Sequence, residues 1–117
     1  MGTDRDRIDL LLPLRPVEFH ILLSLATGER HGYGIIQDIE ARGDAAVPDV
    51  GTMYRALARM AESGLIASAP AAKDSSDERR NYYRITDKGL RLAKAEARRL
   101  QALTRAAKLG GLLEKTT

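Results

Sequence analysis

The 117-residue chain contains no cysteine or tryptophan, and only one phenylalanine, four tyrosines and two histidines. Without cysteine it has no disulfide, no thiolate metal site and no cysteine nucleophile. Its longest apolar cluster, residues 10–14, is five residues long and includes Pro13, far short of the roughly 20 residues of a membrane span. The first residues are acidic and do not resemble a secretory signal. We therefore expect one cytoplasmic domain without membrane contact.

The scarcity of chemically reactive side chains also argues against an enzyme. The two histidines, His20 and His31, are eleven residues apart. The sequence shows no carboxylate pair, no phosphate-binding Gly-Lys-Ser/Thr loop and no His/Asp metal-ligand spacing. His20 lies within an apolar helical pattern, which favours a structural role. We expect no catalytic activity, no metal and no cofactor.

Charge is distributed unevenly along the chain. The formal net charge is +3, but residues 1–50 hold five basic and nine acidic residues, a net charge of −4, whereas residues 51–117 hold fourteen basic and seven acidic residues, a net charge of +7. A basic half of this kind indicates a polyanionic partner, most simply nucleic acid. The alternative interpretation of this charge distribution is a solvated, arginine-rich helix surface without a partner.

The first half of the chain predicts an arm and three short helices. Pro13 and Pro16 prevent one continuous helix, so residues 1–15 form the arm, whose leucines need an apolar surface such as a partner subunit. Apolar side chains then recur at helical spacing, and glycines close each segment. The predicted helices cover residues 16–26, a segment containing Ile35, Ile36 and Ile39 that ends near Gly43, and residues 50–63.

The spacing of apolar residues changes from helical to alternating after Gly64. Residues 65–69 and 79–85 predict two strands, the second with two tyrosines. The polar segment between them, residues 70–78, is too long for a tight turn. The sequence therefore predicts a two-stranded β-hairpin with a polar tip.

A long helix over residues 87–108 is predicted next, with Thr86 as its N-cap. About 22 residues span roughly 33 Å, more than a small domain needs to cover itself. A thin alanine and leucine seam favours pairing with a second copy of the chain, although the helix could also fold back on residues 16–26. We assign residues 87–109 to dimerisation and residues 110–117 to a frayed tail. The candidate dimer contacts are Leu11, Leu12, Ala93, Ala97, Leu100, Leu103 and Ala107.

Three helices followed by a hairpin predict a mainly α winged helix-turn-helix domain over residues 16–86, plus the long C-terminal helix. In such domains the third helix enters the DNA major groove, so it needs an apolar back and a polar front. Residues 50–63 have both, because Met53, Leu57 and Met60 form one stripe. The polar side offers Thr52, Tyr54, Arg55 and Arg59 as DNA contacts. An ordinary solvated helix face is the simpler reading of these arginines.

The hairpin wing carries its own basic residues. Lys73, Arg79, Arg80 and Asn81 are candidates for contacts with phosphates or with a narrow minor groove. Acidic residues at positions 74, 77 and 78 lie among them, so a flexible charged loop without a partner remains an alternative.

Three stretches resemble the PadR family of transcriptional regulators. Together they cover about residues 16–90, and they match best as a set. They are Glu18-Phe19-His20-Ile21-Leu22 leading to His31-Gly32-Tyr33-Gly34-Ile35, then Gly51-Thr52-Met53-Tyr54-Arg55-Ala56-Leu57 leading to Gly64-Leu65-Ile66, and Arg80-Asn81-Tyr82-Tyr83-Arg84-Ile85-Thr86-Asp87-Lys88-Gly89.

The resemblance implies a homodimer that binds a pseudo-palindromic operator, commonly as a repressor. It implies DNA contacts by Tyr33, Thr52, Tyr54 and Arg55. The single helix after the wing resembles the small subfamily. Family members respond to small aromatic effectors, although the drug-stacking tryptophans of some members are missing from this sequence. The alternative function is a winged-helix protein-interaction module that does not bind DNA.

Overall fold

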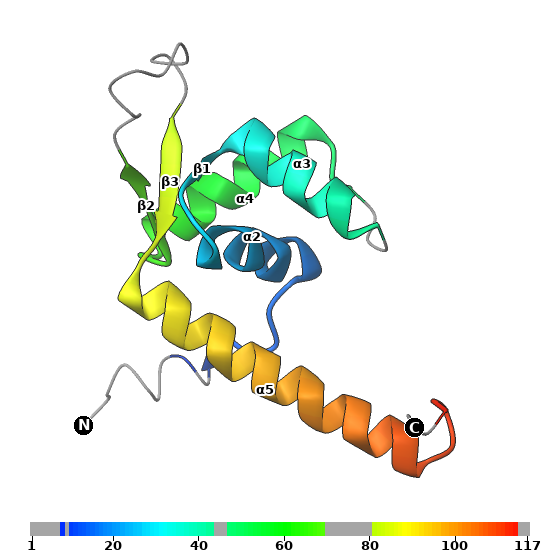
Figure 1. Cartoon of the computed structure of the whole chain (residues 1–117). Coiled ribbons are helices and arrows are strands. Elements are labelled where there is room, and N and C mark those ends of the chain that lie inside the picture. The colour runs from blue at the N-terminus through cyan, green and yellow to red at the C-terminus, as the bar shows by residue number, and fades with distance from the viewer. Residues whose placement is uncertain (1–7, 9, 44–46, 70–80, 115–117) are drawn as a thin grey trace, which may run out of the picture.

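The structure contains the helices and the hairpin in the predicted order (Figure 1). The computed structural model describes residue 8 and residues 10–43, 47–69 and 81–114. Within these ranges the mainly helical architecture predicted from the sequence is confirmed. The elements are α2 (Pro16–Ala26), β1 (Arg30–His31), α3 (Gly32–Arg42), α4 (Val50–Glu62), β2 (Ile66–Ala69), β3 (Tyr82–Ile85) and α5 (Asp87–Leu109).

The sheet has three strands, where the sequence predicted two. β3 lies between β1 and β2 and is antiparallel to both. The strand that the prediction missed is β1, in which Arg30 pairs with Tyr83 and His31 with Tyr82. Two residues are too few to show an alternating pattern. Their strand conformation depends on a partner more than fifty positions away in the sequence, so no local signal marks it.

Helix α2 lies at the centre of the molecule (Figure 1). It packs against α3 and α4 on one side and α5 on the other. The core is aliphatic: Ile21 and Leu22 of α2 are fully buried, and apolar side chains from the other helices surround them. The buried residues that meet α2 include Ile35, Ile39, Met53, Leu57, Met60 and Leu92.

An arginine of α3 fixes that helix against α2. The guanidinium of Arg42 donates to the carbonyl oxygen of His20 at 3.0 Å and to the Ser24 hydroxyl at 3.1 Å. It also donates to Asp38 at 2.8 Å. The Ser24 hydrogen bond, followed by Arg30 and Arg42, lowers the pKa of Asp38 below its ordinary value. This polar cluster holds α3 against α2.

The hairpin joins α5 through a tight junction. The Thr86 hydroxyl accepts a hydrogen bond from the Gly89 backbone N–H at 3.0 Å, which caps the helix as predicted. A Cβ atom at Gly89 would overlap the carbonyl oxygen of Leu65. The absence of a side chain therefore lets α5 begin directly against the loop that precedes β2.

Part of the N-terminal arm packs on its own chain, whereas the sequence suggested a partner subunit as one surface that could bury its leucines. Ile8 and Leu14 belong to the core, and Leu12 is half-buried against it. The backbone N–H of Leu14 donates to the buried Glu96 carboxylate at 3.3 Å. Leu11 remains exposed, and its role in dimerisation stays a prediction.

The two halves of α5 differ in burial. The first half buries Gly89, Leu92 and Glu96, whereas none of residues 100–109 is fully buried in the single chain. Among the candidate dimer contacts, Ala93 packs partly on the core, Leu100 and Ala107 are half-buried, and Ala97 and Leu103 are exposed. No helix in the described ranges is long and apolar enough to cross a membrane.

Candidate nucleic-acid interface

The first turn of α4 is organised by its N-cap residue. The Asp49 carboxylate accepts hydrogen bonds from the Thr52 backbone N–H at 2.8 Å and from the Thr52 hydroxyl at 3.1 Å. These two bonds, together with the charge of Arg55, lower the pKa of Asp49. Arg55 in turn donates to the Thr52 hydroxyl at 3.3 Å. An exposed chain of polar groups therefore occupies the start of the helix.

Helix α4 has the two faces that groove binding requires. Met53, Ala56, Leu57 and Met60 are buried along its length. Arg55 and Tyr54 are exposed, Tyr54 to 45%. A groove-binding helix needs a packed back and a polar front of this kind.

A glycine brings the start of α3 against α4. The Tyr54 ring lies over Gly32, where an added Cβ atom would come within 2.5 Å of the Tyr54 hydroxyl oxygen. Any side chain at this position would push the tyrosine away. The adjacent Tyr33 is 53% exposed. Two tyrosines and the polar turn of α4 therefore share one end of the helix pair.

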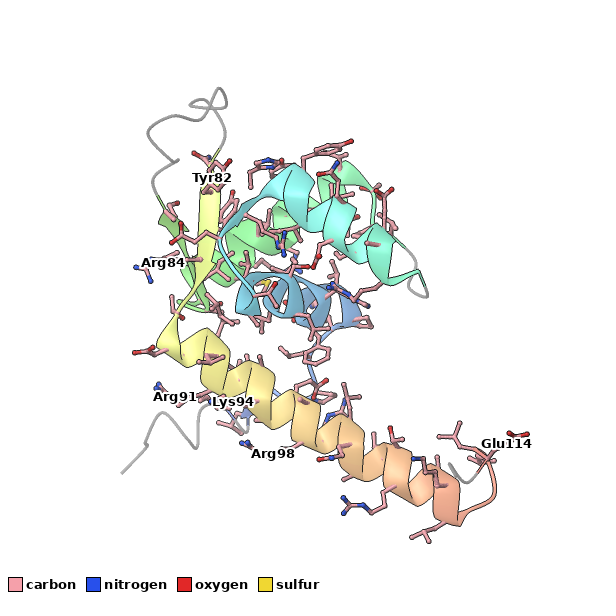
Figure 2. The ribbon with its side chains drawn as sticks, viewed as in Figure 1. Tyr82, Arg84, Arg91, Lys94, Arg98 and Glu114 are labelled. Atoms are coloured by element: carbon pink, nitrogen blue, oxygen red, sulfur yellow. The ribbon has the colours of Figure 1, made fainter. Side chains whose placement is uncertain are left out.

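Aromatic contacts connect this end to the wing. The His31 ring stacks with Tyr33 at a centroid distance of 6.5 Å and meets Tyr82 edge-on at 5.3 Å. Tyr82 lies on β3, the strand that enters from the wing (Figure 2). His31 also caps α3, because its Nδ1 accepts the Gly34 backbone N–H at 2.9 Å. One side chain thus joins the wing strand to the start of α3.

Tyr83, on the opposite side of β3 from Tyr82, connects the wing with α4. Burial is the main reason that its pKa is raised, and the neighbouring Tyr54 phenol raises it further. Asn81 hydrogen-bonds to the same tyrosine. The exposed Asn81 is the described member of the predicted wing contacts. Lys73, Arg79 and Arg80 lie outside the described residues.

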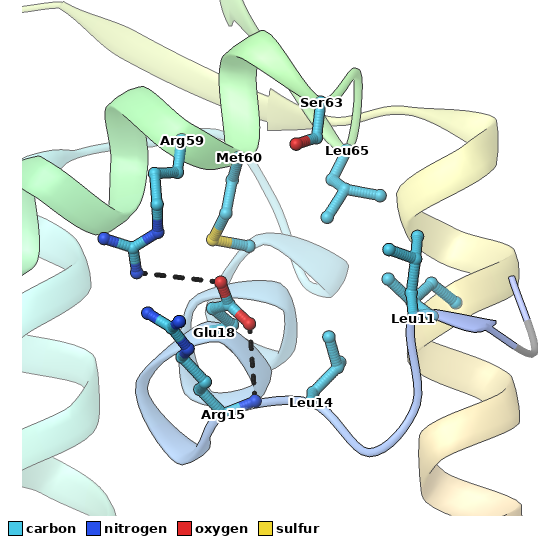
Figure 3. A pocket seen from close by; sticks show the side chains of 9 residues that line it. Leu11, Leu14, Arg15, Glu18, Arg59, Met60, Ser63 and Leu65 are labelled. Carbon is cyan, nitrogen blue, oxygen red and sulfur yellow. Dashed lines mark hydrogen bonds and ion pairs between the residues drawn. The ribbon is translucent and has the colours of Figure 1, made fainter.

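Arg59 is directed toward α2, where Figure 3 shows it beside Glu18. Its guanidinium forms an ion pair with Glu18 of α2 at 3.7 Å. It lines a cavity of about 230 Å³ between the arm, α2, α4 and α5, whose apolar walls include Leu14, Met60 and Leu92. The structure therefore brings together Tyr33, Thr52, Tyr54 and Arg55 and places Arg59 toward α2.

Two features of this interface were missed from the sequence. His31 is both the N-cap of α3 and part of β1, and Asp49 organises Thr52 and Arg55. A cap signal existed for each, since polar side chains precede both helices, but the aromatic contacts required the folded sheet. Among the described residues no group of three or more His, Asp or Glu side chains could hold a metal ion.

Three helices, with α4 presented beside a β-hairpin, define a winged helix-turn-helix protein. The sequence model of the transcriptional regulator PadR-like family matches residues 21–95. The chain therefore belongs to the PadR-like family of transcriptional regulators, and the family predicted from the sequence is confirmed. This membership makes the chain a regulator rather than an enzyme.

Solved structures support the same fold. A PadR family transcription regulator from Clostridium difficile R20291 is 27% identical, with a TM-score of 0.71 over 80% of this chain and 95% of that one. A transcriptional regulator from Clostridium thermocellum is 27% identical, with a TM-score of 0.65 over 92% and 95%. Bacillus subtilis PadR in complex with operator DNA is 23% identical, with a TM-score of 0.60 over 69% and 46%. No curated protein matches the chain closely enough to count as a relative.

Proposed function

We propose that this protein regulates transcription by binding duplex DNA sequence-selectively, with α4 in the major groove. The observation that carries the proposal is the exposed polar end shared by α3 and α4, where Thr52, Tyr54 and Arg55 lie beside Tyr33. A related fold in the Bacillus subtilis PadR structure is bound to operator DNA, which supports this use of the surface. A DNA partner also agrees with the cytoplasmic location expected from the sequence.

The proposed contact residues differ in the part of the DNA that each could bind. Arg55 has the geometry to bond guanine or phosphate bidentately. The hydroxyls of Tyr33, Thr52 and Tyr54 suit phosphate or base-edge contacts, which fix the register of the protein on the duplex. In this arrangement Lys73, Arg79, Arg80 and Asn81 bring the wing to an adjacent groove or backbone.

We further propose a homodimer that binds a pseudo-palindromic operator as a repressor. The second half of α5 supplies the surface, since Leu103 is 54% exposed and Leu100 and Ala107 lie three and four residues from it on the same face. A thin seam of small and leucine side chains suits close helix pairing. Two copies would present two α4 helices to two half-sites, which increases affinity and specificity.

Release by a small aromatic effector completes the proposal. The cavity beside Arg59 offers a site, because it is apolar, open and bounded by α4. Its volume of about 230 Å³ exceeds that of an engineered cavity that binds benzene. An occupant there would displace Arg59 or Glu18 and so alter the support of α4.

Fluorescence anisotropy with the DNA upstream of the protein's own gene tests the main claim. A scrambled duplex of the same length and composition is the control. We expect tighter binding to the upstream duplex and a steep loss of affinity as salt increases, because phosphate contacts release counterions. Equal, weak binding to both duplexes at every salt concentration would contradict sequence-selective binding to that site and favour a protein-interaction module.

A further inference from the structure

A row of basic side chains runs along the side of the molecule away from the polar end of α4 (Figure 2). Arg84 lies on β3, and Arg91, Lys94 and Arg98 follow on α5. All four are exposed. We call these four residues the basic row. None of them belongs to the DNA contacts proposed above.

The helical spacing keeps the α5 members of this row on one face. Positions 91, 94 and 98 are separated by three and four residues, so their side chains lie one above another. They cover about 10 Å of the helix axis at 1.5 Å per residue. Leu92 and Glu96 point into the core, so the basic row occupies the outer surface of the helix.

Acidic side chains compensate little of this charge. Helix α5 contains two acidic residues in 23, Asp87 and Glu96. Glu96 is buried and hydrogen-bonded to Arg99 at 2.6 Å and 2.9 Å, so its negative charge is paired with Arg99 and not with the basic row. Asp87 is exposed at the start of the helix, between Arg84 and Arg91. Within α5, the outer face therefore carries one acidic residue, Asp87, and three members of the basic row, Arg91, Lys94 and Arg98.

The row also remains accessible in the proposed dimer. At 100° per residue, Leu100 and Leu103 lie about 120° or more from each of Arg91, Lys94 and Arg98. Ala97 lies closer, about 60° from Lys94, so the proposed dimer contact that leaves the basic row open is centred on Leu100 and Leu103. Pairing two basic rows face to face would be repulsive. Dimerisation through the seam thus leaves the basic row facing solvent.

We propose that the basic row binds the backbone phosphates of DNA that flanks the operator. This inference rests on the proposed function, because binding to the operator brings the adjoining duplex close to the protein. Arg84 lies on β3, three residues after Asn81, the described wing candidate, so the row leads from Asn81 onto α5. A duplex that bends past the wing would follow this path, and arginine and lysine are the usual phosphate contacts. Such contacts are independent of sequence.

The test compares two duplexes with the same operator. One ends at the operator and the other is extended by about 20 base pairs, two helical turns, on each side. We expect the wild-type protein to bind the long duplex about tenfold more tightly at moderate salt. Four added phosphate contacts per protomer should also make the slope of log affinity against log salt steeper by about 3.6 for each protomer.

The informative variant is the triple substitution Arg91→Gln, Lys94→Gln and Arg98→Gln. It should bind the short duplex nearly as the wild type does and lose the advantage of the long one. A double variant that keeps the charge, Arg91→Lys with Arg98→Lys, should retain that advantage. Comparing the two duplexes for each protein cancels any effect of net charge on the operator contacts, and circular dichroism confirms that each variant is folded.

Three results would overturn the inference. The wild-type protein could bind long and short duplexes equally, the triple variant could keep the full difference, or it could lose affinity for both duplexes by the same factor. A failure of the proposed function itself looks different, because the short operator would then bind no better than a scrambled duplex of equal length.

Discussion

Helices α4 and α5 use the same residue types in opposite ways. Both are amphipathic, rich in arginine and opened by a polar N-cap, Asp49 in α4 and Thr86 in α5. Helix α4 buries one apolar stripe along its whole length and keeps its polar face in solvent. Helix α5 buries only its first half and leaves its second half bare.

One carboxylate from each helix region, Asp49 before α4 and Glu96 in α5, illustrates this difference in burial. Asp49 is exposed and holds Thr52, which in turn bonds Arg55. Glu96 is buried, with its side chain 3% exposed, and holds Arg99 and the Leu14 backbone N–H. We therefore expect similar acid–arginine arrangements to stabilise the fold where they are buried and to leave polar groups available for the proposed DNA contacts where they are exposed. Five predictions test this comparison.

The largest effect is expected at the buried carboxylate. Glu96→Ala should lower the free energy of unfolding by about 3 kcal/mol, because it leaves Arg99 and the Leu14 N–H without their buried partner. Urea denaturation measures the change. Glu62→Ala, at an exposed position of α4, is the matched control and should change stability by less than about 0.5 kcal/mol. Equal effects of the two substitutions would contradict the structural role of Glu96.

The same carboxylate should contribute to the pH dependence of stability. The Arg99 hydrogen bonds lower the pKa of Glu96 in the folded protein. The stabilisation is then complete above the unfolded-chain pKa of about 4.3 and is lost as pH falls through the folded value. Denaturation curves of wild type and Glu96→Gln should therefore converge in acid. A difference that stays constant from neutral pH into acid would show that ionisation of Glu96 does not matter.

The bare half of α5 gives the next prediction. Leu103→Gln should weaken the dimer by about 2 kcal/mol, roughly thirtyfold, because each copy would lose one buried leucine. Analytical ultracentrifugation over a concentration series measures the dissociation constant. The control is Ala102→Gln, which introduces the same side chain one residue earlier, at an exposed position that points away from Leu100 and Leu103. It should leave the dimer intact. A wild-type protein that stays monomeric, with or without DNA, would refute the homodimer.

Much of this architecture could be predicted from the sequence because local signals marked it. The helical spacing of Met53, Leu57 and Met60 predicted the bounds of α4, and the Thr86 N-cap predicted the start of α5, each within a residue or two. Strand β1 could not be predicted, since Arg30 and His31 become a strand only by pairing with β3.

The candidate interface was predictable in composition but not in arrangement. Sequence spacing put Arg55 and Arg59 on one polar side of a helix. Which of them faces a neighbouring helix depends on Glu18 of α2, 41 positions earlier in the chain. The contact between Gly32 and Tyr54 likewise forms only when α3 and α4 are packed together. Long-range packing therefore decides which polar residues remain available for binding.

The two arginines of α4, Arg55 and Arg59, test whether packing decides which polar residues can bind DNA. Arg55→Ala should weaken operator binding by about 1–3 kcal/mol, because its exposed guanidinium suits bidentate contact with guanine. Arg59→Ala should cost less than about 0.5 kcal/mol of operator affinity, since Arg59 is turned toward Glu18. Anisotropy titrations with the upstream duplex compare the two variants. A larger loss for Arg59→Ala would mean that its side chain leaves Glu18 when DNA binds.

The smallest effects are expected at the two caps. Asp49→Ala should cost about 1 kcal/mol of stability. Thr86→Ala should cost somewhat more, about 1.5 kcal/mol, because its hydroxyl also contacts the carbonyl oxygens of Gly64 and Leu65 at the junction of the hairpin and α5. Operator affinity should respond in the opposite order, since Asp49 organises Thr52 and Arg55 whereas Thr86 lies far from them. If both variants lost stability and affinity in the same proportion, the assignment of Asp49 to the DNA-binding surface and of Thr86 to the fold would be wrong.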